Sequence, residues 1–171
     1  MRKSILSVIA IALVSVFAFT SCEKEKTMTE LLTQTKGWSL VAATCTEGYT
    51  MNSGAVINDL YNDGYVMDEE KDDIITFNAD GFVYWNPGKL QIEGDPTTET
   101  TIGKWTLDEE NNLIGMQIPQ FGVTEDSEIE NCNLVTLDEK TLKVSYHFTI
   151  TDDNAKAPGT YTFVLTYEVA K

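Results

Sequence analysis

The feature that most constrains this chain is an alternation of apolar and polar residues, with a period of two, near its C-terminal end. Within residues 141–150, the even-numbered positions hold Leu142, Val144, Tyr146, Phe148 and Ile150. Residues 160–170 repeat the alternation. Successive side chains of a β-strand point to opposite faces of the sheet, so each run has one apolar and one polar face. This pattern is typical of antiparallel sheets that bury one face and expose the other.

Six further runs have a strand-like composition and bring the expected number of strands to eight. The first starts at Trp38, and the others cover residues 73–78, 81–86, 100–107, 112–118 and 129–137. Ahead of them, Thr27-Met28-Thr29-Glu30 matches the capping box, a pattern in which two side chains satisfy backbone N–H groups at a helix start. The sequence therefore predicts one short helix over residues 29–35.

The links between these strands alternate strictly between long and short. The short links are residues 78–81, 108–111 and 138–140, and the long links are residues 46–72, 87–99, 119–128 and 151–159. In a meander, alternate links lie at opposite ends, so one end carries tight turns and the other carries long loops. Eight such strands close most simply into a barrel, which leaves no exposed edge. We therefore expect an all-β fold, an eight-stranded antiparallel up-and-down β-barrel with a short N-terminal helix.

The residues Asn-Ala-Asp-Gly at positions 78–81 predict the geometry of the first tight turn. A type I turn followed by a left-handed residue suits Gly81, because glycine has no Cβ to strain that conformation. The resulting three-residue loop pairs Asn78 with Phe82. Phe77 and Trp85 then share one face of the hairpin, which we take as the inward face of the barrel.

The N-terminal residues indicate export and lipidation. Residues 1–21 combine a positive start, an apolar run over residues 5–19 and small residues before Cys22. This is the organisation of a secretory signal peptide, and the run is shorter than the roughly 20 apolar residues that span a bilayer. The sequence Phe19-Thr20-Ser21-Cys22 resembles a bacterial lipobox, which implies cleavage before Cys22 and acylation of that residue. Two or three acyl chains give stable anchoring.

The expected organisation is a lipoprotein signal peptide over residues 1–21, a lipidated tether over residues 22–28 and one barrel domain over residues 29–171. The expected location is the outer membrane of the cell envelope, on its periplasmic face or at the cell surface. Contact with the membrane is expected through the acyl chains on Cys22.

Charge limits the partners of the mature chain. Loss of Arg2 and Lys3 leaves ten of the 12 basic residues against 27 acidic ones, a net charge of −17. Such a chain repels nucleic acid and anionic lipid head groups. We therefore expect no nucleic-acid partner, and we expect a monomer.

Cys45 and Cys132 are the other two cysteines. Export to an oxidising compartment favours a disulfide. Against it, the two residues fall on strands that we place far apart in the barrel, whereas a bridge needs Cβ atoms about 3.5–4.5 Å apart. The sequence leaves both a disulfide and two buried thiols open.

Five motifs occur in an order that resembles a known family. They are KGWSL at residues 36–40, KDDIITFNADGFV at 71–83, GKWTLDEENNL at 103–113, TLDEKTLKVSY at 136–146 and YTFVLTYEV at 161–169. Together they resemble the lipocalin-like domain lipoproteins of Gram-negative bacteria over residues 31–171. Classical lipocalins carry Gly-x-Trp on the first strand, where the tryptophan plugs the closed end. This chain has Gly37-Trp38 there and the spaced form, Gly103-Lys104-Trp105, on a later strand. The resemblance implies an architecture rather than an activity.

Signals of enzymatic chemistry are few. His147 is the single histidine and lies on the polar face of its strand, where we expect solvent exposure. A histidine-rich metal site or a Ser-His-Asp triad would rest on that residue alone. The acidic residues 68–73 lack the spaced ligands and central glycine of a calcium loop, and they are interpreted as a solvated charge run. We therefore expect no catalysis, no cofactor and no metal.

Aromatic residues give a better signal for binding. They either fill the barrel or form the walls of a ligand cavity, and Phe148 and Tyr167 are expected on the same inward face. The candidate ligand-binding residues are Trp38, Trp85, Trp105, Tyr146, Phe163 and Tyr61. The link over residues 46–72 is too apolar for a free linker. We expect it to cover the barrel mouth as a lid, with a short helix over residues 55–61.

Three functions remain open at this point. The leading interpretation is a lipid-anchored module that binds a small, partly apolar ligand between the barrel wall and the lid. The alternative is a non-catalytic structural or protein-interaction subunit of an envelope complex, with a filled barrel and the long loops as binding surface. The third is an inhibitor that presents one loop to a target enzyme. A cavity of ~300 Å³ or more would favour a ligand, and a filled barrel with an apolar surface patch would favour a protein partner.

Overall fold

The computed structural model describes residues 25–50, 53–90, 93–94, 96–116, 130–150 and 158–171. Its elements are α1 (Met28–Leu32), β1 (Trp38–Thr50), β2 (Val56–Asp59), the 3₁₀ helix η1 (Asp68–Glu70), β3 (Ile74–Phe77), β4 (Phe82–Asn86), β5 (Thr100–Asp108), β6 (Leu113–Met116), β7 (Glu130–Leu137), β8 (Thr141–Ile150) and β9 (Gly159–Val169). The signal peptide, Cys22 and the link over residues 119–128 lie outside the described residues.

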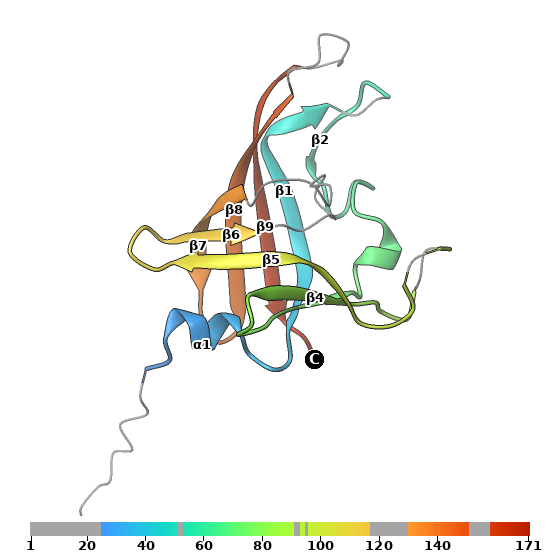
Figure 1. Ribbon diagram of the computed structural model, residues 1–171. Coiled ribbons are helices and arrows are strands. Elements are labelled where there is room, and N and C mark those ends of the chain that lie inside the picture. Colours follow the sequence, from blue (N-terminus) through green and yellow to red (C-terminus); the bar gives the residue numbers. More distant parts are fainter. Residues whose placement is uncertain (1–24, 51–52, 91–92, 95, 117–129, 151–157) are drawn as a thin grey trace, which may run out of the picture.

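The fold is a closed eight-stranded antiparallel β-barrel with one extra strand and one short helix, which confirms the expected fold class (Figure 1). Strands β3 to β9 pair in sequence order, as a meander requires, and β9 returns to β1. The seam between β1 and β3 is short, because these strands pair only at Trp38 and Ile75. The other edge of β1 pairs with β9 from Trp38 to Cys45.

The structure corrects two expectations about the first long link. β1 continues to Thr50 instead of ending before residue 46, and Val56–Asp59 forms the strand β2 where a helix over residues 55–61 was expected. Because β3 leaves β1 after one pair, the rest of that edge presents backbone groups that need partners. β2 supplies them, and its Asn58 adds a bond from Nδ2 to the carbonyl oxygen of Cys45 at 2.9 Å. Long-range pairing therefore decides the structure of this segment.

The first tight turn forms as the sequence predicts. Gly81 has a φ of 85°, its N–H donates to the carbonyl oxygen of Asn78 at 3.0 Å, and the N–H of Asn78 donates to that of Phe82 at 3.0 Å. In the resulting register, Phe77 lies opposite Val83, and both side chains are buried. The inward face assigned from the sequence is therefore confirmed for this hairpin.

Helix α1 and Trp38 together close one end of the barrel. The capping box forms, with Thr27 and Glu30 each bonded to the other's backbone N–H, and the helix ends at Leu32, before the expected residue 35. The indole Nε1 of Trp38 donates to the carbonyl oxygen of Leu32 at 2.9 Å, and both side chains are fully buried. Trp38 thus joins the helix to the first strand and fills the closed end.

The chain enters the barrel at the end that carries the tight turns. Lys26, in the tether, forms an ion pair at 2.8 Å with Glu139 in the β7–β8 turn. On α1, the hydroxyl of Thr29 donates to Glu109 in the β5–β6 turn at 3.4 Å. Figure 1 shows α1 and the C-terminal end of β9 at this same end of the barrel.

The core is one cluster that is filled mainly by the inward residues of the eight barrel strands, with Leu32, Leu60 and Val66 packed into it. Phe148 packs against the buried Phe163, with ring centroids 6.2 Å apart, as its predicted inward face requires, but its side chain remains 37% exposed. The pairing of β7 with β8 ends at Ser145, so the rest of β8, including Phe148, has only β9 as its partner among the described residues. Cys45 and Cys132 are both buried and are not joined by a disulfide. Among the described residues, no helix is long and apolar enough to cross a membrane.

Candidate functional site

A cavity lies where the barrel wall meets residues 60–71, which we call the covering segment. Its volume is about 60 Å³. This is the space of about two water molecules at a liquid volume of about 30 Å³ each. The residues that line it are Trp38, Leu40, Tyr65, Val66, Glu70, Asp73, Ile75 and Tyr167. They come from β1, from the start of β3, from β9 and from the covering segment, so the cavity sits at the short seam between β1 and β3.

Two buried side chains fix the covering segment to the barrel. Leu60 is 1% exposed, and its N–H donates to the carbonyl oxygen of Ala43 on β1 at 2.8 Å. Val66 is also buried, and its N–H donates to the carbonyl oxygen of Leu60 at 3.0 Å. The segment therefore covers the β1–β3 seam as an ordered part of the fold, whereas the sequence led us to expect a lid over the barrel mouth.

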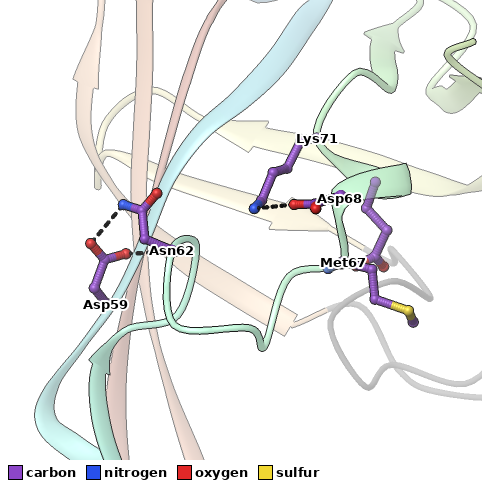
Figure 2. A network of polar contacts seen from close by, with 6 residues as sticks. Asp59, Asn62, Met67, Asp68 and Lys71 are labelled. Carbon is purple, nitrogen blue, oxygen red and sulfur yellow. Dashed lines mark hydrogen bonds and ion pairs between the residues drawn. The ribbon is translucent and has the colours of Figure 1, made fainter. Parts of the chain in front are cut away.

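Polar contacts at both ends of the covering segment set its shape (Figure 2). The carboxylate of Asp59 accepts bonds from the backbone and side chain of Asn62, and these donors lower the pKa of Asp59. Lys71 pairs with Asp68 at 2.6 Å and lowers the pKa of that carboxyl. Next to Lys71, the carboxylate of Glu70 accepts a bond from the backbone N–H of Met67 at 2.8 Å. Glu70 is also one of the residues that line the cavity.

The two aspartates after Lys71 connect the start of β3 to the link that follows β4. Asp73 is buried, and its carboxylate accepts bonds from the indole Nε1 of Trp85 at 2.8 Å and from the N–H of Gly88 at 2.9 Å. Asp72 accepts a bond from the N–H of Lys89 at 2.7 Å. The acidic run that the sequence indicated as solvated is therefore partly structural. The linear sequence does not show that this acidic run lies next to Pro87-Gly88 in the fold.

Tyr167 is the least satisfied polar residue at the cavity. Its side chain is 2% exposed, and its hydroxyl has no hydrogen-bond partner among the residues that the structure describes. Burial raises the pKa of this hydroxyl well above its usual value, and the nearby Tyr146 and Cys132 raise it further. Tyr167 therefore stays protonated and keeps unused hydrogen-bonding capacity inside the barrel.

The six residues that the sequence singled out for binding separate into different places. Trp38 lines the cavity. Trp85 does not line it, but its indole donates a hydrogen bond to Asp73, which does. Trp105 packs against Phe77 with ring centroids 6.0 Å apart, and its Nε1 donates to the carbonyl oxygen of Asn78. The other three lie elsewhere: Tyr146 and Phe163 stack on each other, and Tyr61 lines a groove on the outer surface. Tyr167 was expected to face inward, but neither it nor Tyr65 or Glu70 was among the candidate binding residues, because the seam that joins them exists only in the closed barrel.

Aromatic rings also gather at the rim near the end of β1. The ring of Tyr49 lies 5.3 Å from that of Tyr65, 5.7 Å from that of Tyr161 and 5.9 Å from that of Phe163, measured between centroids. Tyr65 belongs to this cluster and to the cavity lining, and it is 42% exposed. It therefore links the cavity to the surface.

An open groove of about 610 Å³ lies on the outer surface over the β1–β9 pair and the β3 edge. It is bordered by Val41 on β1, by Tyr61 and Lys71 of the covering segment, and by residues 87–89. Val41 is 36% exposed, and the ammonium group of Lys71 lies 5.1 Å from the ring centroid of Tyr61. The groove is thus larger than the cavity but open to solvent and mixed in polarity.

His147 is exposed, as predicted, and takes part in a polar network on the outer face. The hydroxyl of Thr162 lies 3.2 Å from its Nδ1 and donates to Glu47 at 2.8 Å. The backbone N–H of Thr162 also donates to Glu47, and these bonds lower the pKa of the Glu47 carboxyl. None of the three residues lines the cavity. Within the described ranges, no group of three or more His, Cys, Asp or Glu residues is placed to hold a metal ion.

Comparisons with known proteins add no assignment. No protein-family model, no characterised protein and no solved structure matches this chain significantly. The resemblance of its motifs to lipocalin-like lipoproteins therefore stays a hypothesis from the sequence.

Proposed function

We propose that this protein is a lipid-anchored, non-catalytic binding module of the cell envelope, related to the lipocalin-like lipoproteins. It holds a small group of a partly apolar ligand between the barrel wall and the covering segment. The observation that carries the proposal is the cavity at the β1–β3 seam, with polar groups in an otherwise apolar lining. Ligand sites typically combine apolar walls with a few placed polar groups.

The size of the cavity restricts what the ligand buries there. A volume of about 60 Å³ is far below the ~300 Å³ of a site that encloses a whole drug-sized molecule. The proposed ligand therefore inserts one small group, and the remainder lies outside, past the half-exposed Tyr65. A ligand enclosed within the barrel, as the sequence allowed, does not fit this volume.

Native mass spectrometry of the lipidated protein, extracted gently from its own membrane, tests the proposal. Wild-type protein should carry a small molecule in addition to its acyl chains. Val66→Phe, which fills the cavity, should lose that molecule, and Leu40→Phe fills it from the opposite wall as a second variant. Val135→Phe alters an exposed valine on β7 and should retain the molecule. Wild-type protein that carries acyl chains alone would contradict ligand binding.

Lipidation is tested separately with labelled palmitate. Only the thiol of Cys22 forms the thioether that attaches diacylglycerol, so Cys22→Ser should incorporate no label. Incorporation at the parental level in that variant would contradict the anchor.

The surface groove favours a second candidate function, that of a protein-interaction subunit. Its volume of about 610 Å³ accommodates a side chain or a short peptide, and Val41 provides exposed apolar surface within it. A photo-crosslinking residue at position 41, compared with the same residue at the more exposed position 135 outside the groove, tests this function. Crosslinks to one envelope protein from position 41 alone would favour it, and equal crosslinking from both positions would oppose it.

A further inference from the structure

The lining of the cavity at the β1–β3 seam is acidic. Two acidic residues, Glu70 and Asp73, line it, and none of its eight lining residues is basic. Both carboxylates are held in place by backbone or side-chain donors: Met67 fixes Glu70, and Trp85 and Gly88 fix Asp73. Charged groups that are already oriented bind an opposite charge without a further loss of side-chain entropy. An anionic group would instead meet two like charges here.

The walls of the same cavity are aromatic. Trp38, Tyr65 and Tyr167 contribute three of the eight lining residues. The negative face of an aromatic ring attracts cations within about 6 Å of its centroid, and this attraction grows as water is excluded. The Tyr167 hydroxyl also has no hydrogen-bond partner within the described ranges, and a hydroxyl can accept a bond from an ammonium N–H.

The lysine of the covering segment, Lys71, does not line the cavity. Lys71 follows Glu70 directly, but its ammonium group pairs with Asp68 at 2.6 Å and lies over the ring of Tyr61. This lysine is one of the residues that border the outer groove and is not among those that line the cavity. The acidic, aromatic cavity is thus left for a cation from outside the chain.

We propose that the cavity binds an alkylammonium group, the amine end of a small organic cation whose apolar chain leaves past Tyr65. An ammonium nitrogen and the carbon that carries it have two non-hydrogen atoms, which suits a volume of about 60 Å³. Glu70 and Asp73 supply the opposite charge, and Trp38, Tyr65 and Tyr167 surround the cation. This inference rests on the proposed binding function and names the chemical class of its ligand.

The experiment titrates the full lipidated protein with butylammonium, butanol and butyrate, three probes of equal chain length and different charge. The indole N–H of Trp38 gives an NMR signal at the cavity, so its shift reports binding there. Butylammonium should shift this signal saturably, and butyrate should not. Glu70→Gln keeps the size of the side chain and removes its charge, so the affinity for butylammonium should fall about tenfold.

Three variants separate charge from structure. Glu69→Gln changes the neighbouring carboxylate, which does not line the cavity, and should leave the affinity unchanged. Glu70→Asp keeps the charge and should recover part of the affinity, which a purely structural role of Glu70 would not explain. Val66→Phe should abolish binding of every probe.

The outcomes distinguish this inference from the proposed function. If butanol or butyrate binds as tightly as butylammonium, and Val66→Phe abolishes that binding, the site exists but does not select a cation. Equal losses from Glu69→Gln and Glu70→Gln would also overturn the inference. If no probe shifts the Trp38 signal saturably and native mass spectrometry finds no bound molecule, the proposed function itself is overturned.

Discussion

The indole Nε1 of Trp85 donates a hydrogen bond to the Oδ2 atom of Asp73 at 2.8 Å, and both side chains are buried. Trp85→Phe removes this donor from a buried carboxylate and should lower the free energy of unfolding by about 2–3 kcal/mol. Trp105→Phe is the matched comparison, because the indole of Trp105 donates to a neutral, part-buried carbonyl, and it should lose about 1 kcal/mol. Urea unfolding measures both. Equal losses would show that the charge of Asp73 adds nothing to the bond.

Gly88 lies against the carboxylate of Asp72, and a Cβ atom at this position would overlap it. The backbone N–H of Lys89 holds the carboxylate in place, so it does not move aside easily. Gly88→Ala should therefore destabilise the protein by about 1–3 kcal/mol. In Gly159→Ala, a Cβ meets nothing within 4 Å, and the change should stay within about 0.5 kcal/mol. Thermal unfolding of the two variants should differ; similar melting temperatures would contradict the tight contact.

Gly81 tests backbone conformation alone, because a Cβ there meets only the carbonyl oxygen of Trp105 at 4.0 Å. Its φ of 85° strains a β-branched residue, so Gly81→Val should lose roughly 1–3 kcal/mol of stability. Gly81→Asn should lose less, because asparagine tolerates the left-handed region better. Chemical denaturation of both variants measures the difference. The reverse ranking would show that the left-handed conformation of Gly81 does not decide the outcome.

The sequence predicts those parts of the fold that depend on neighbouring residues, and it does not predict those that depend on long-range strand pairing. The alternation around Leu142 and Val144 and the turn at Gly81 depend on neighbouring residues, and both form as predicted. The β2 strand and the exposure of Phe148 depend on which strand edges remain open after closure. No local pattern contains that information, which explains why the helix expected over residues 55–61 does not form.

The candidate site was predictable only in part. The apolar link over residues 46–72 was expected to pack on the barrel, and its residues Leu60 and Val66 do so, but they cover the β1–β3 seam and not the mouth. Trp38 was identified because a large aromatic residue starts the first strand. Glu70 and Asp73 were not identified, because in the sequence they are two of several adjacent acids. Only the bonds to Met67 and Trp85 distinguish them from the neighbouring acids.

Tyr167 makes stability depend on alkaline pH. Its pKa is raised in the folded state, so above the usual tyrosine pKa near ~10 the unfolded chain loses this proton first. The unfolded state then binds fewer protons than the folded state, and the free energy of unfolding falls as the pH rises. The free energy of unfolding of Tyr167→Phe should therefore change less than that of the wild type between pH ~8 and ~11. It should also be more stable at neutral pH by about 1 kcal/mol, because it removes a buried hydroxyl without a partner.

Urea unfolding at several pH values measures this effect. Tyr65→Phe is the control. Tyr65 is 42% exposed, and burial raises its pKa less than it raises the pKa of Tyr167. Its alkaline sensitivity should stay closer to that of the wild type. An unchanged pH dependence in Tyr167→Phe would show that another group controls alkaline unfolding.

The last prediction concerns the orientation of the barrel on the membrane. The tether meets the barrel at the tight-turn end, where Lys26 pairs with Glu139. From there, the 13 residues of β1 rise by about 3.3 Å each, so the far end of β1 and its partner Val56 lie about 40 Å away along the strand. If acyl chains on Cys22 anchor the protein, the tight turns face the bilayer and the rim of the barrel faces the aqueous side. The net charge of −17 further disfavours contact between the rim and anionic head groups.

Spin labels on single cysteines at Lys140 and Val56 test this orientation in vesicles that contain the lipidated protein. Both positions are exposed, whereas Cys45 and Cys132 are buried and should not react with the label. Oxygen, which concentrates in the bilayer, should relax the label at position 140 more strongly. A water-soluble nickel complex should relax the label at position 56 more strongly. The opposite ranking would place the rim against the membrane, and the ligand would then reach the cavity from the lipid instead of from water.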